Sequence, residues 1–238
     1  MYLRKSKQNY VRQQGGSLSM DEKNSHNASR KYIQDFNPDI VRLTEQYQDY
    51  FQSFNAGFGN ENFTEFLQDG EWEEYLQDKN GVTFIVFDNI SEHEKKIVAY
   101  YTVCAGAIPY TDRWLIPEDE RDETGKEYDE EECGISAVEI KMFAVSEEYQ
   151  DLFFCYGGYE KPIAAWILHA IIDSIRELTF TTLAAKTIFL QAVPEAEQFY
   201  INNGFDYVQT GMRAFHTVDS EFKAMYLPFV ELKIHYDK

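Results

Sequence analysis

Apolar and polar residues alternate along AVEIKMFAV, residues 137–145, where Glu139 and Lys141 separate the apolar positions. This period-two alternation predicts a strand with one buried face. A loop over residues 146–161, a buried helix over 162–178, an apolar strand over 186–193 and a short helix over 194–205 are predicted to follow. In the loop, an anionic ligand would meet free backbone N–H groups and the positive end of the buried helix. This succession organises the chain.

The other predicted elements flank this region. They are a short strand over 31–37, helices over 39–54 and 61–77, strands over 82–88 and 97–108, and closing strands over 206–211 and 224–234. Asn60 can cap the helix over 61–77, and Gly70 can split that helix in two. The strands over 82–88 and 97–108 are expected to form an antiparallel pair. Pro228 indicates an edge or a bulge in the last strand.

Together these elements predict an α/β (α+β) fold with a mixed central β-sheet flanked by helices. We expect one domain over residues 31–238, preceded by a flexible tail over residues 1–30. An acidic insertion over 117–133 begins PEDERDETGKEYDEEE, with ten acids and two bases. It is too charged to pack, so we expect a mobile segment between strands. An alternative interpretation is an acidic lip that attracts a cationic substrate.

Composition excludes global disorder, because 44% hydrophobic and 16% aromatic residues can build a core. The net charge of −19 repels phosphate backbones and anionic membranes, which argues against a nucleic-acid partner. The same charge would favour cationic partners such as amines, polyamines or basic peptides. A plainer interpretation is that the charge keeps the protein soluble.

The cysteines, Cys104, Cys133 and Cys155, are odd in number, and no two have the spacing of metal ligands. They are expected to be reduced thiols in a cytoplasmic protein. The basic N-terminus is not followed by an apolar run, so no signal peptide is predicted. No stretch approaches the roughly eighteen apolar residues of a membrane span. Neither a metal site nor a membrane partner is therefore expected.

The sequence has no GxxxxGK[ST], GxGxxG, GxSxG or HExxH motif. Instead, several stretches resemble the GNAT superfamily of acetyl-CoA-dependent N-acetyltransferases. EIKMFAV (139–145) resembles its central strand, EYQ (148–150) the start of its pyrophosphate loop, and AEQFYINNGF (196–205) its final signature A-x-x-F-Y-x-x-x-G-F. FNAGFGNENFTEFLQ (54–68) and the strands over 82–88 and 97–108 are similar to a bacterial subgroup that includes acetyltransferase toxins.

The resemblance implies acetyl-CoA as co-substrate, bound at the splayed end of the central strand and at the loop before the buried helix. The residues so implicated are Phe143, Ala144, Val145, Gln150, Ile163, Ala164 and Ala165. The chain departs from the family pattern in two places. DLFFCYGGYEK lengthens the loop between Gln150 and Pro162, and Val193 replaces an Asn that often contacts the cofactor. Backbone amides do not need glycine to bind phosphate unless φ is positive.

The resemblance also implies two catalytic residues. Tyr200 occupies the Tyr of the FY pair, which in the superfamily protonates the sulfur of coenzyme A. Glu139 lies on the central strand where some members place a general base, and the alternative is that it points to solvent. A backbone N–H within residues 143–145 is expected to bind the developing oxyanion. His169 is interpreted as a core or interface residue.

The sequence therefore predicts an N-acetyltransferase that moves acetyl directly to a primary amine in a ternary complex. The acceptor is expected to be a small molecule or a protein. Two alternatives stay open: a non-catalytic GNAT-like module that acts through protein partners, and a toxin that acetylates aminoacyl-tRNA. The charge of −19 argues against the toxin. The closing hairpin could also pair edges between two copies and form a homodimer.

Overall fold

A computed structural model of the protein describes residues 30–91, 94–121, 123–208 and 222–232. Residues 1–31 and 32–238 form two units, and every helix that the structure describes lies in the second. The predicted tail over residues 1–30 lies outside the described residues, apart from Arg30. Among the described residues, no helix combines the length and the apolar character needed to cross a lipid bilayer.

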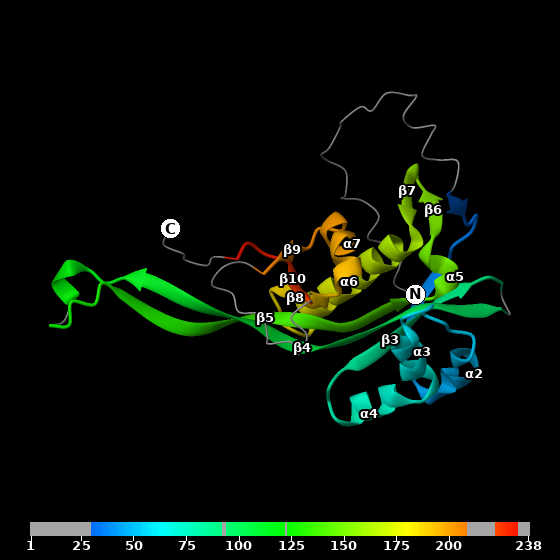
Figure 1. Cartoon of the computed structure of the whole chain (residues 1–238), viewed down its shortest axis with the longest axis horizontal. Coiled ribbons are helices and arrows are strands. Elements are labelled where there is room, and N and C mark those ends of the chain that lie inside the picture. Colours follow the sequence, from blue (N-terminus) through cyan, green and yellow to red (C-terminus); the bar gives the residue numbers. More distant parts are fainter. Residues whose placement is uncertain (1–29, 92–93, 122, 209–221, 233–238) are drawn as a thin grey trace. The chain divides into compact units, whose positions relative to one another are not determined.

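A seven-stranded sheet forms the centre of the second unit (Figure 1). Its strands, in spatial order, are β2 (Pro38–Arg42), β3 (Val82–Asn89), β4 (Lys95–Leu115), β5 (Tyr128–Val145), β8 (Thr187–Ala192), β10 (Lys223–Pro228) and β9 (Asp206–Tyr207). Neighbouring strands are antiparallel except β5 and β8, which are parallel. The predicted mixed central sheet is therefore confirmed.

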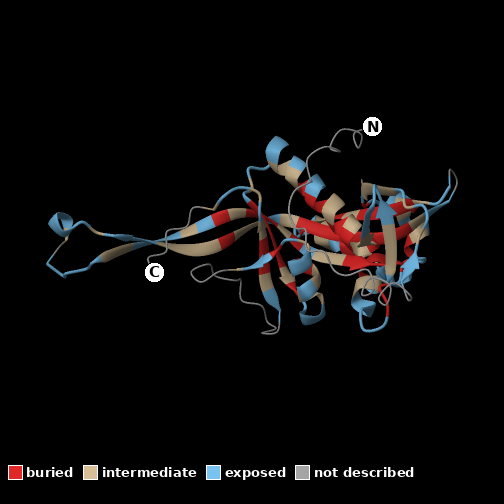
Figure 2. Cartoon of the chain, turned by 90° about the horizontal axis from the view of Figure 1, so that it is seen from above, coloured by how far each residue is buried: buried red, intermediate tan, exposed pale blue. Residues whose placement is uncertain are grey.

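Helices cover both faces of this sheet (Figure 1). On one face lie α6 (Ile163–Thr181) and α7 (Glu197–Asn202); on the other lie α2 (Gln48–Phe51), α3 (Glu61–Gln68) and α4 (Glu71–Gln77). The α6 face packs Ile167 and Ile171 against Ile140, and the opposite face packs Phe66 and Leu67 with Tyr100. Burial is concentrated where the sheet meets these layers (Figure 2). The sheet thus separates two distinct hydrophobic cores.

From Ala107↔Ser136 to Leu115↔Tyr128, β4 and β5 pair with each other and with no third strand among the described residues. This two-stranded ribbon projects from the rest of the sheet (Figure 1). The predicted mobile insertion over 117–133 is therefore wrong for residues 128–133, which belong to β5. Cross-strand pairing overrides their charge, because Tyr128–Cys133 pair in continuous register with Tyr110–Leu115 of β4. Across this pair, Nε of Arg113 also lies 3.5 Å from Oε1 of Glu130. The turn of the ribbon carries the 3₁₀ helix η3 (Glu118–Glu120).

The N-terminal part of the unit differs from the sequence prediction. The helix predicted over 39–54 is wrong over its first residues, which form β2, and the strand predicted over 31–37 is reduced to β1 (Lys31–Tyr32). β-Branched Ile40 and Val41 pair with β3 instead. Helical structure begins only at η2 (Glu45–Tyr47) and α2. Tertiary pairing therefore overrides the helical spacing of these residues.

The loop predicted over 146–161 is also wrong, because this segment is structured. It forms α5 (Glu147–Gln150) and an antiparallel hairpin of β6 (Leu152–Tyr156) and β7 (Tyr159–Pro162). The turn is Gly157-Gly158, with φ of +60° and +82°, as a two-residue hairpin turn requires. β6 also pairs with β1. Pro162 is the N-cap of α6 and does not lie in its first turn.

The remaining predicted elements are found with small changes. Gly70, at φ +83°, separates α3 from α4, as its position predicted. The helix predicted over 194–205 is the 3₁₀ helix η4 (Pro194–Ala196) followed by α7. The closing strands pair as a hairpin, but β10 ends at Pro228 and lies between β8 and β9, so it is not the edge strand. Residues 209–211 and 233–234 of the predicted closing strands lie outside the described residues.

Candidate active site

The candidate site lies where β5 and β8 separate. These two parallel strands pair only from Ala137↔Thr187 to Ile140↔Leu190, whereas β5 continues to Val145. The opening holds a cavity of about 290 Å³. Its walls are residues 140–145 of β5, Leu190 and Gln191 of β8, Ala56, Asn60 and Phe63 from the α3 side, Gln150, and Val193, Glu195, Ala196 and Tyr200 from the α7 side. The cavity is therefore bounded by both helical layers.

A bulge in β5 shapes one wall of the cavity. Thr102 of β4 pairs with Met142 and Val103 pairs with Ile140, so Lys141 has no partner in the register. The extra residue changes the alternation of side chains. Ile140 belongs to the core on the α6 face, whereas Met142 packs against the core on the α3 face. The period-two alternation predicted along residues 137–145 is therefore interrupted at Lys141.

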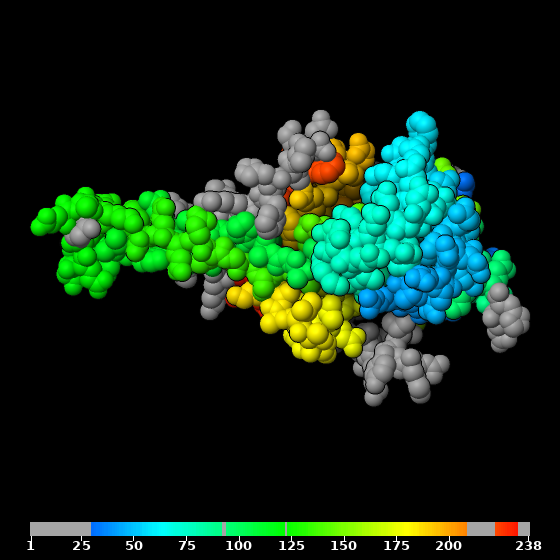
Figure 3. All heavy atoms as spheres, turned by 90° about the horizontal axis from the view of Figure 1, so that it is seen from below, coloured from blue at the N-terminus to red at the C-terminus, as the bar shows by residue number. Residues whose placement is uncertain are grey.

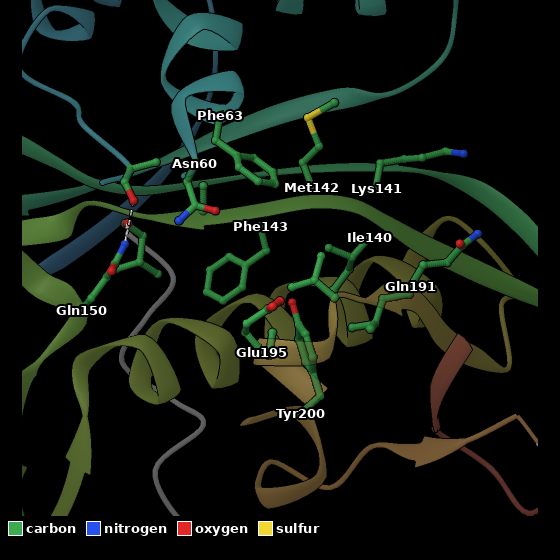
Figure 4. Close-up of a pocket in the computed structure, with 16 residues that line it drawn as sticks. Asn60, Phe63, Ile140, Lys141, Met142, Phe143, Gln150, Gln191, Glu195 and Tyr200 are labelled. Atoms are coloured by element: carbon green, nitrogen blue, oxygen red, sulfur yellow. Dashed lines mark hydrogen bonds between the residues drawn. The ribbon is translucent and has the colours of Figure 1, made fainter. Parts of the chain in front are cut away.

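Tyr200 lies where the sequence predicted a catalytic residue. It projects from α7 into the cavity, while Asn60 and Phe63 approach from α3 on the other side of β5 (Figure 4). The Tyr200 side chain is 8% exposed and packs edge-on against Phe199 and Phe205, with ring centroids 5.3 and 5.5 Å away. Burial raises the pKa of Tyr200. Its hydroxyl is therefore protonated at neutral pH and can donate a hydrogen bond or a proton.

Glu139, the other predicted catalytic residue, is not among the cavity residues. Its Oε2 lies 3.2 Å from Nζ of Lys141, which does line the cavity, and accepts a hydrogen bond from Sγ of Cys104 at 3.6 Å. The side chain of Glu139 is only 12% exposed. Burial, and then the Glu139 carboxylate, raise the pKa of Cys104 to about 11. Glu139 is therefore connected to the cavity only through its ion pair with Lys141.

Four of the predicted cofactor residues, Phe143, Ala144, Val145 and Gln150, line the cavity. The side-chain amide of Gln150 donates hydrogen bonds of 2.9 Å to the carbonyl oxygens of Val145 and Ala56. Gln150 thus ties the end of β5 to the turn before α3. This geometry gives Gln150 a positioning role at the end of the cavity.

The other three predicted cofactor residues, Ile163, Ala164 and Ala165, form the first turn of α6 and are not among the cavity residues. Ile163 and Ala165 are buried, whereas Ala164 is partly exposed. The N-cap Pro162 is extended and makes no side-chain capping bond. Within the described part of the chain, no N-cap side chain accepts a hydrogen bond from the first N–H groups of this 19-residue helix, so these groups suit an anion.

Sequence reasoning missed several cavity residues, namely Asn60, Phe63, Lys141, Met142, Gln191 and Glu195. Asn60 was predicted to cap α3, but its side chain makes no capping bond. Its position before a helix indicated a different role, although Asn60 and Phe63 both lie in the stretch over 54–68 that resembles the toxin subgroup. Glu195 directly precedes the final signature, and Gln191 lies in the predicted strand before it, so both could have been indicated by these elements. The described residues hold no group of three His, Cys, Asp or Glu side chains that could bind a metal ion.

Neither a family model nor a curated protein matches this sequence. Solved structures do match. A tyrosine-to-phenylalanine mutant of the toxin AtaT has a TM-score of 0.54 and 18% identity, over 83% of this chain and 93% of that one. The structure of AtaTR bound with acetyl-CoA has a TM-score of 0.53 and 18% identity, over 81% of this chain and 94% of that one. The structure of AtaT complexed with acetyl-methionyl-tRNAfMet has a TM-score of 0.51 and 17% identity, over 81% of this chain and 95% of that one.

These matches cover most of this chain and most of each solved structure. Their sequence identity is low, so the likeness concerns the arrangement of the backbone. That arrangement is the one expected from EIKMFAV and AEQFYINNGF. The chain therefore has the mixed α/β fold of the toxin AtaT, and the predicted resemblance is confirmed at the level of the fold.

Proposed function

We propose that this protein is an acetyl-CoA-dependent N-acetyltransferase that moves acetyl to a primary amine in a ternary complex. The observation that carries the proposal is the cavity between β5 and β8, which has residues of α3 at one side and Tyr200 of α7 at the other. A thioester and an amine that enter from opposite faces of the sheet would meet there. Structures with this fold include AtaTR bound with acetyl-CoA.

The described residues offer donors that fit acetyl-CoA. The uncapped N–H groups of Ile163, Ala164 and Ala165 would hold its phosphates, and the apolar walls beside Phe143 would enclose its pantetheine arm. The bound thioester supplies an activated acetyl carbon. A backbone N–H within residues 143–145 would donate to the carbonyl oxygen as negative charge develops.

Proton transfer completes the proposed reaction. Attack by the neutral amine forms the N–C bond, and the C–S bond breaks. The Tyr200 hydroxyl, which lines the cavity, would donate its proton to the departing sulfur. Glu139 stays the proposed acceptor of the amine proton. Because it lies outside the cavity lining, it would act through a water beside Lys141. After release of the thiol, the proton that Glu139 accepted would pass through this water to the Tyr200 oxygen, so that both groups regain their initial states.

Acetyl-CoA is expected to stabilise the protein against heat. A ligand at about 100 times its Kd adds roughly 2.7 kcal/mol to the free energy of unfolding, which raises Tm clearly. Scanning fluorimetry with acetyl-CoA, followed by thiol release with a panel of amines, measures binding and turnover separately. An unchanged Tm at millimolar acetyl-CoA would contradict the proposal and favour the non-catalytic, partner-binding module.

The substitution Ala164→Asp tests the proposed phosphate site. A carboxylate in the first turn of α6 should weaken acetyl-CoA binding more than tenfold. Two unit charges roughly 7 Å apart repel by about 1.6 kcal/mol at an effective dielectric constant near 30. The same charge at a helix N-terminus favours folding by about 0.3–1 kcal/mol. Calorimetric titration of Ala164→Asp against the uncharged Ala164→Asn isolates the charge. Equal affinities of the two variants would place the phosphates elsewhere.

A second candidate acceptor is the amino group of an aminoacyl-tRNA. The complex of AtaT with acetyl-methionyl-tRNAfMet favours it, because AtaT has the same fold. The net charge of −19 opposes it. If this repulsion dominates, charged tRNA should bind weakly, and its affinity should be nearly independent of the salt concentration. Tight binding that falls steeply with salt concentration would instead support the tRNA acceptor.

A further inference from the structure

A tight turn before α3 presents one aromatic side chain to solvent beside the cavity. The turn runs from Asn55 to Asn60, and Gly57 and Gly59 have φ of +92° and +81°. Phe58, between these glycines, is 96% exposed. Ala56 lies two residues before Phe58 and Asn60 lies two residues after it, and both line the cavity. Phe58 therefore lies on the rim of the proposed active site.

Several hydrogen bonds hold this turn in place. Within the turn, Gly57 N donates to Oδ1 of Asn55 at 2.9 Å, and Asn60 N donates to the Gly57 carbonyl at 3.1 Å. Its base is attached to α5, because Glu147 N donates to the Asn55 carbonyl at 2.8 Å and Asn55 Nδ2 donates to Glu147 Oε2 at 3.1 Å. Anchoring on both sides fixes the backbone that carries Phe58. A partner would therefore find this ring already presented.

A single exposed aromatic residue is common on protein surfaces and has no meaning alone. Phe180, on the last turn of α6, is also 77% exposed. Phe58 differs in two respects: its backbone is tied on both sides, and its neighbours line the cavity. A small amine inside a cavity of about 290 Å³ would leave Phe58 in water. Only an acceptor that extends over the rim would bury this ring.

The layer that carries Phe58 has charge of one sign. Between residues 43 and 78 the chain has no Lys or Arg. It has nine acids, namely Glu45, Asp49, Glu61, Glu65, Asp69, Glu71, Glu73, Glu74 and Asp78. All except Glu73 are exposed, and this layer covers a broad face of the molecule, shown in blue to cyan (Figure 3). Such a surface attracts cations and repels the phosphates of a nucleic acid.

We propose that the acceptor is a basic polypeptide segment whose amine enters the cavity while a neighbouring aromatic or large apolar side chain packs on Phe58. The acidic layer of residues 43–78 attracts the segment, and Phe58 selects among basic segments by the side chain beside the amine. This inference rests on the proposed N-acetyltransferase activity and names its acceptor class. A small free amine is attracted by the acidic layer but does not extend to Phe58, and aminoacyl-tRNA meets the acidic layer with the wrong charge.

The test compares lysine-rich peptides that carry either Trp or Gly beside the acceptor amine. The Trp peptide should have the lower KM. Phe58→Ala should raise that KM about tenfold and leave the KM of acetyl-CoA unchanged, whereas Phe58→Trp should retain the preference. Phe180→Ala is the matched control and should change neither value. Equal KM values for the two peptides, or no effect of Phe58→Ala, would overturn the role of Phe58.

A pair of charge reversals tests the acidic layer. Glu65→Lys with Glu74→Lys changes two exposed acids of α3 and α4, and Glu118→Lys with Glu120→Lys makes the same change in net charge at the tip of the ribbon. The first pair should raise the peptide KM severalfold, most strongly at low salt. The second pair should leave it unchanged. Equal effects of the two pairs would overturn the assignment to this layer.

Two measurements distinguish failure of this inference from failure of the proposed activity. If acetyl-CoA raises Tm and charged tRNA or a small amine releases thiol faster than either peptide, the acceptor class is wrong and the activity stands. If acetyl-CoA neither binds nor releases thiol with any acceptor, both proposals fall. Peptide turnover that depends on Phe58 supports both.

Discussion

The variant Tyr200→Phe is expected to lower kcat by about 100-fold or more, with little change in the KM of acetyl-CoA. Removal of a general acid typically costs about 10²–10⁴ in rate. The phenol is protonated at neutral pH, as a tyrosine with the ordinary pKa of about 10 already is, so the wild-type side chain holds a proton that Phe lacks. The ring is retained, and with it the packing against Phe199 and Phe205. Steady-state thiol release measures both constants.

Tyr128→Phe is a suitable control for this loss. Tyr128 lies on the ribbon, with Arg113 stacked on its ring at 4.2 Å, an interaction that Phe can keep. The Tyr128→Phe variant also loses one phenolic hydroxyl, and its kcat should equal that of the wild type. Scanning fluorimetry should give Tyr200→Phe a Tm close to that of the wild type. A normal kcat in Tyr200→Phe would remove this residue from the mechanism and leave water as the source of the proton.

The variant Phe54→Ala is expected to lower the free energy of unfolding by about 3–5 kcal/mol, as for other buried Phe→Ala changes. Phe54 is 0% exposed and packs edge-on against Tyr100, with ring centroids 5.4 Å apart. Its carbonyl also accepts a hydrogen bond of 3.0 Å from Nε2 of Gln68. A loss of this size removes a large part of the usual 5–15 kcal/mol of a folded domain. Urea denaturation measures it.

Phe58→Ala provides the comparison, because it is the same substitution four residues further along the chain. The Phe58 side chain is 96% exposed, so its loss should change stability by no more than about 0.5 kcal/mol. The two variants thus distinguish Phe54, which stabilises the α3 layer by packing inside it, from Phe58, which this layer exposes to solvent. Similar losses of stability in both variants would mean that Phe58 packs against protein in solution.

The sequence predicted the core succession of elements because those elements rest on local patterns. Alternation along residues 137–145, the apolar run of α6 and the Pro and Gly signals around α7 each determine a structure over a short distance. The resemblance carried by AEQFYINNGF then gave the fold and placed Tyr200, which does line the cavity. Gly157-Gly158 was an equally local signal, since two adjacent glycines between apolar runs favour a hairpin turn, and it was interpreted as a loop.

What the sequence by itself determined, then, was the order of the main elements, the fold and the position of Tyr200. Only the tertiary structure decided the rest. Ile40 and Val41 join a strand because β3 offers a partner, and Lys141 bulges because β4 fixes the register on either side of it. The place of Glu139 outside the cavity, and of Phe58 on its rim, depends on segments distant in sequence that meet in space. Local patterns cannot encode such pairings, because each depends on which neighbour the folded chain brings into contact.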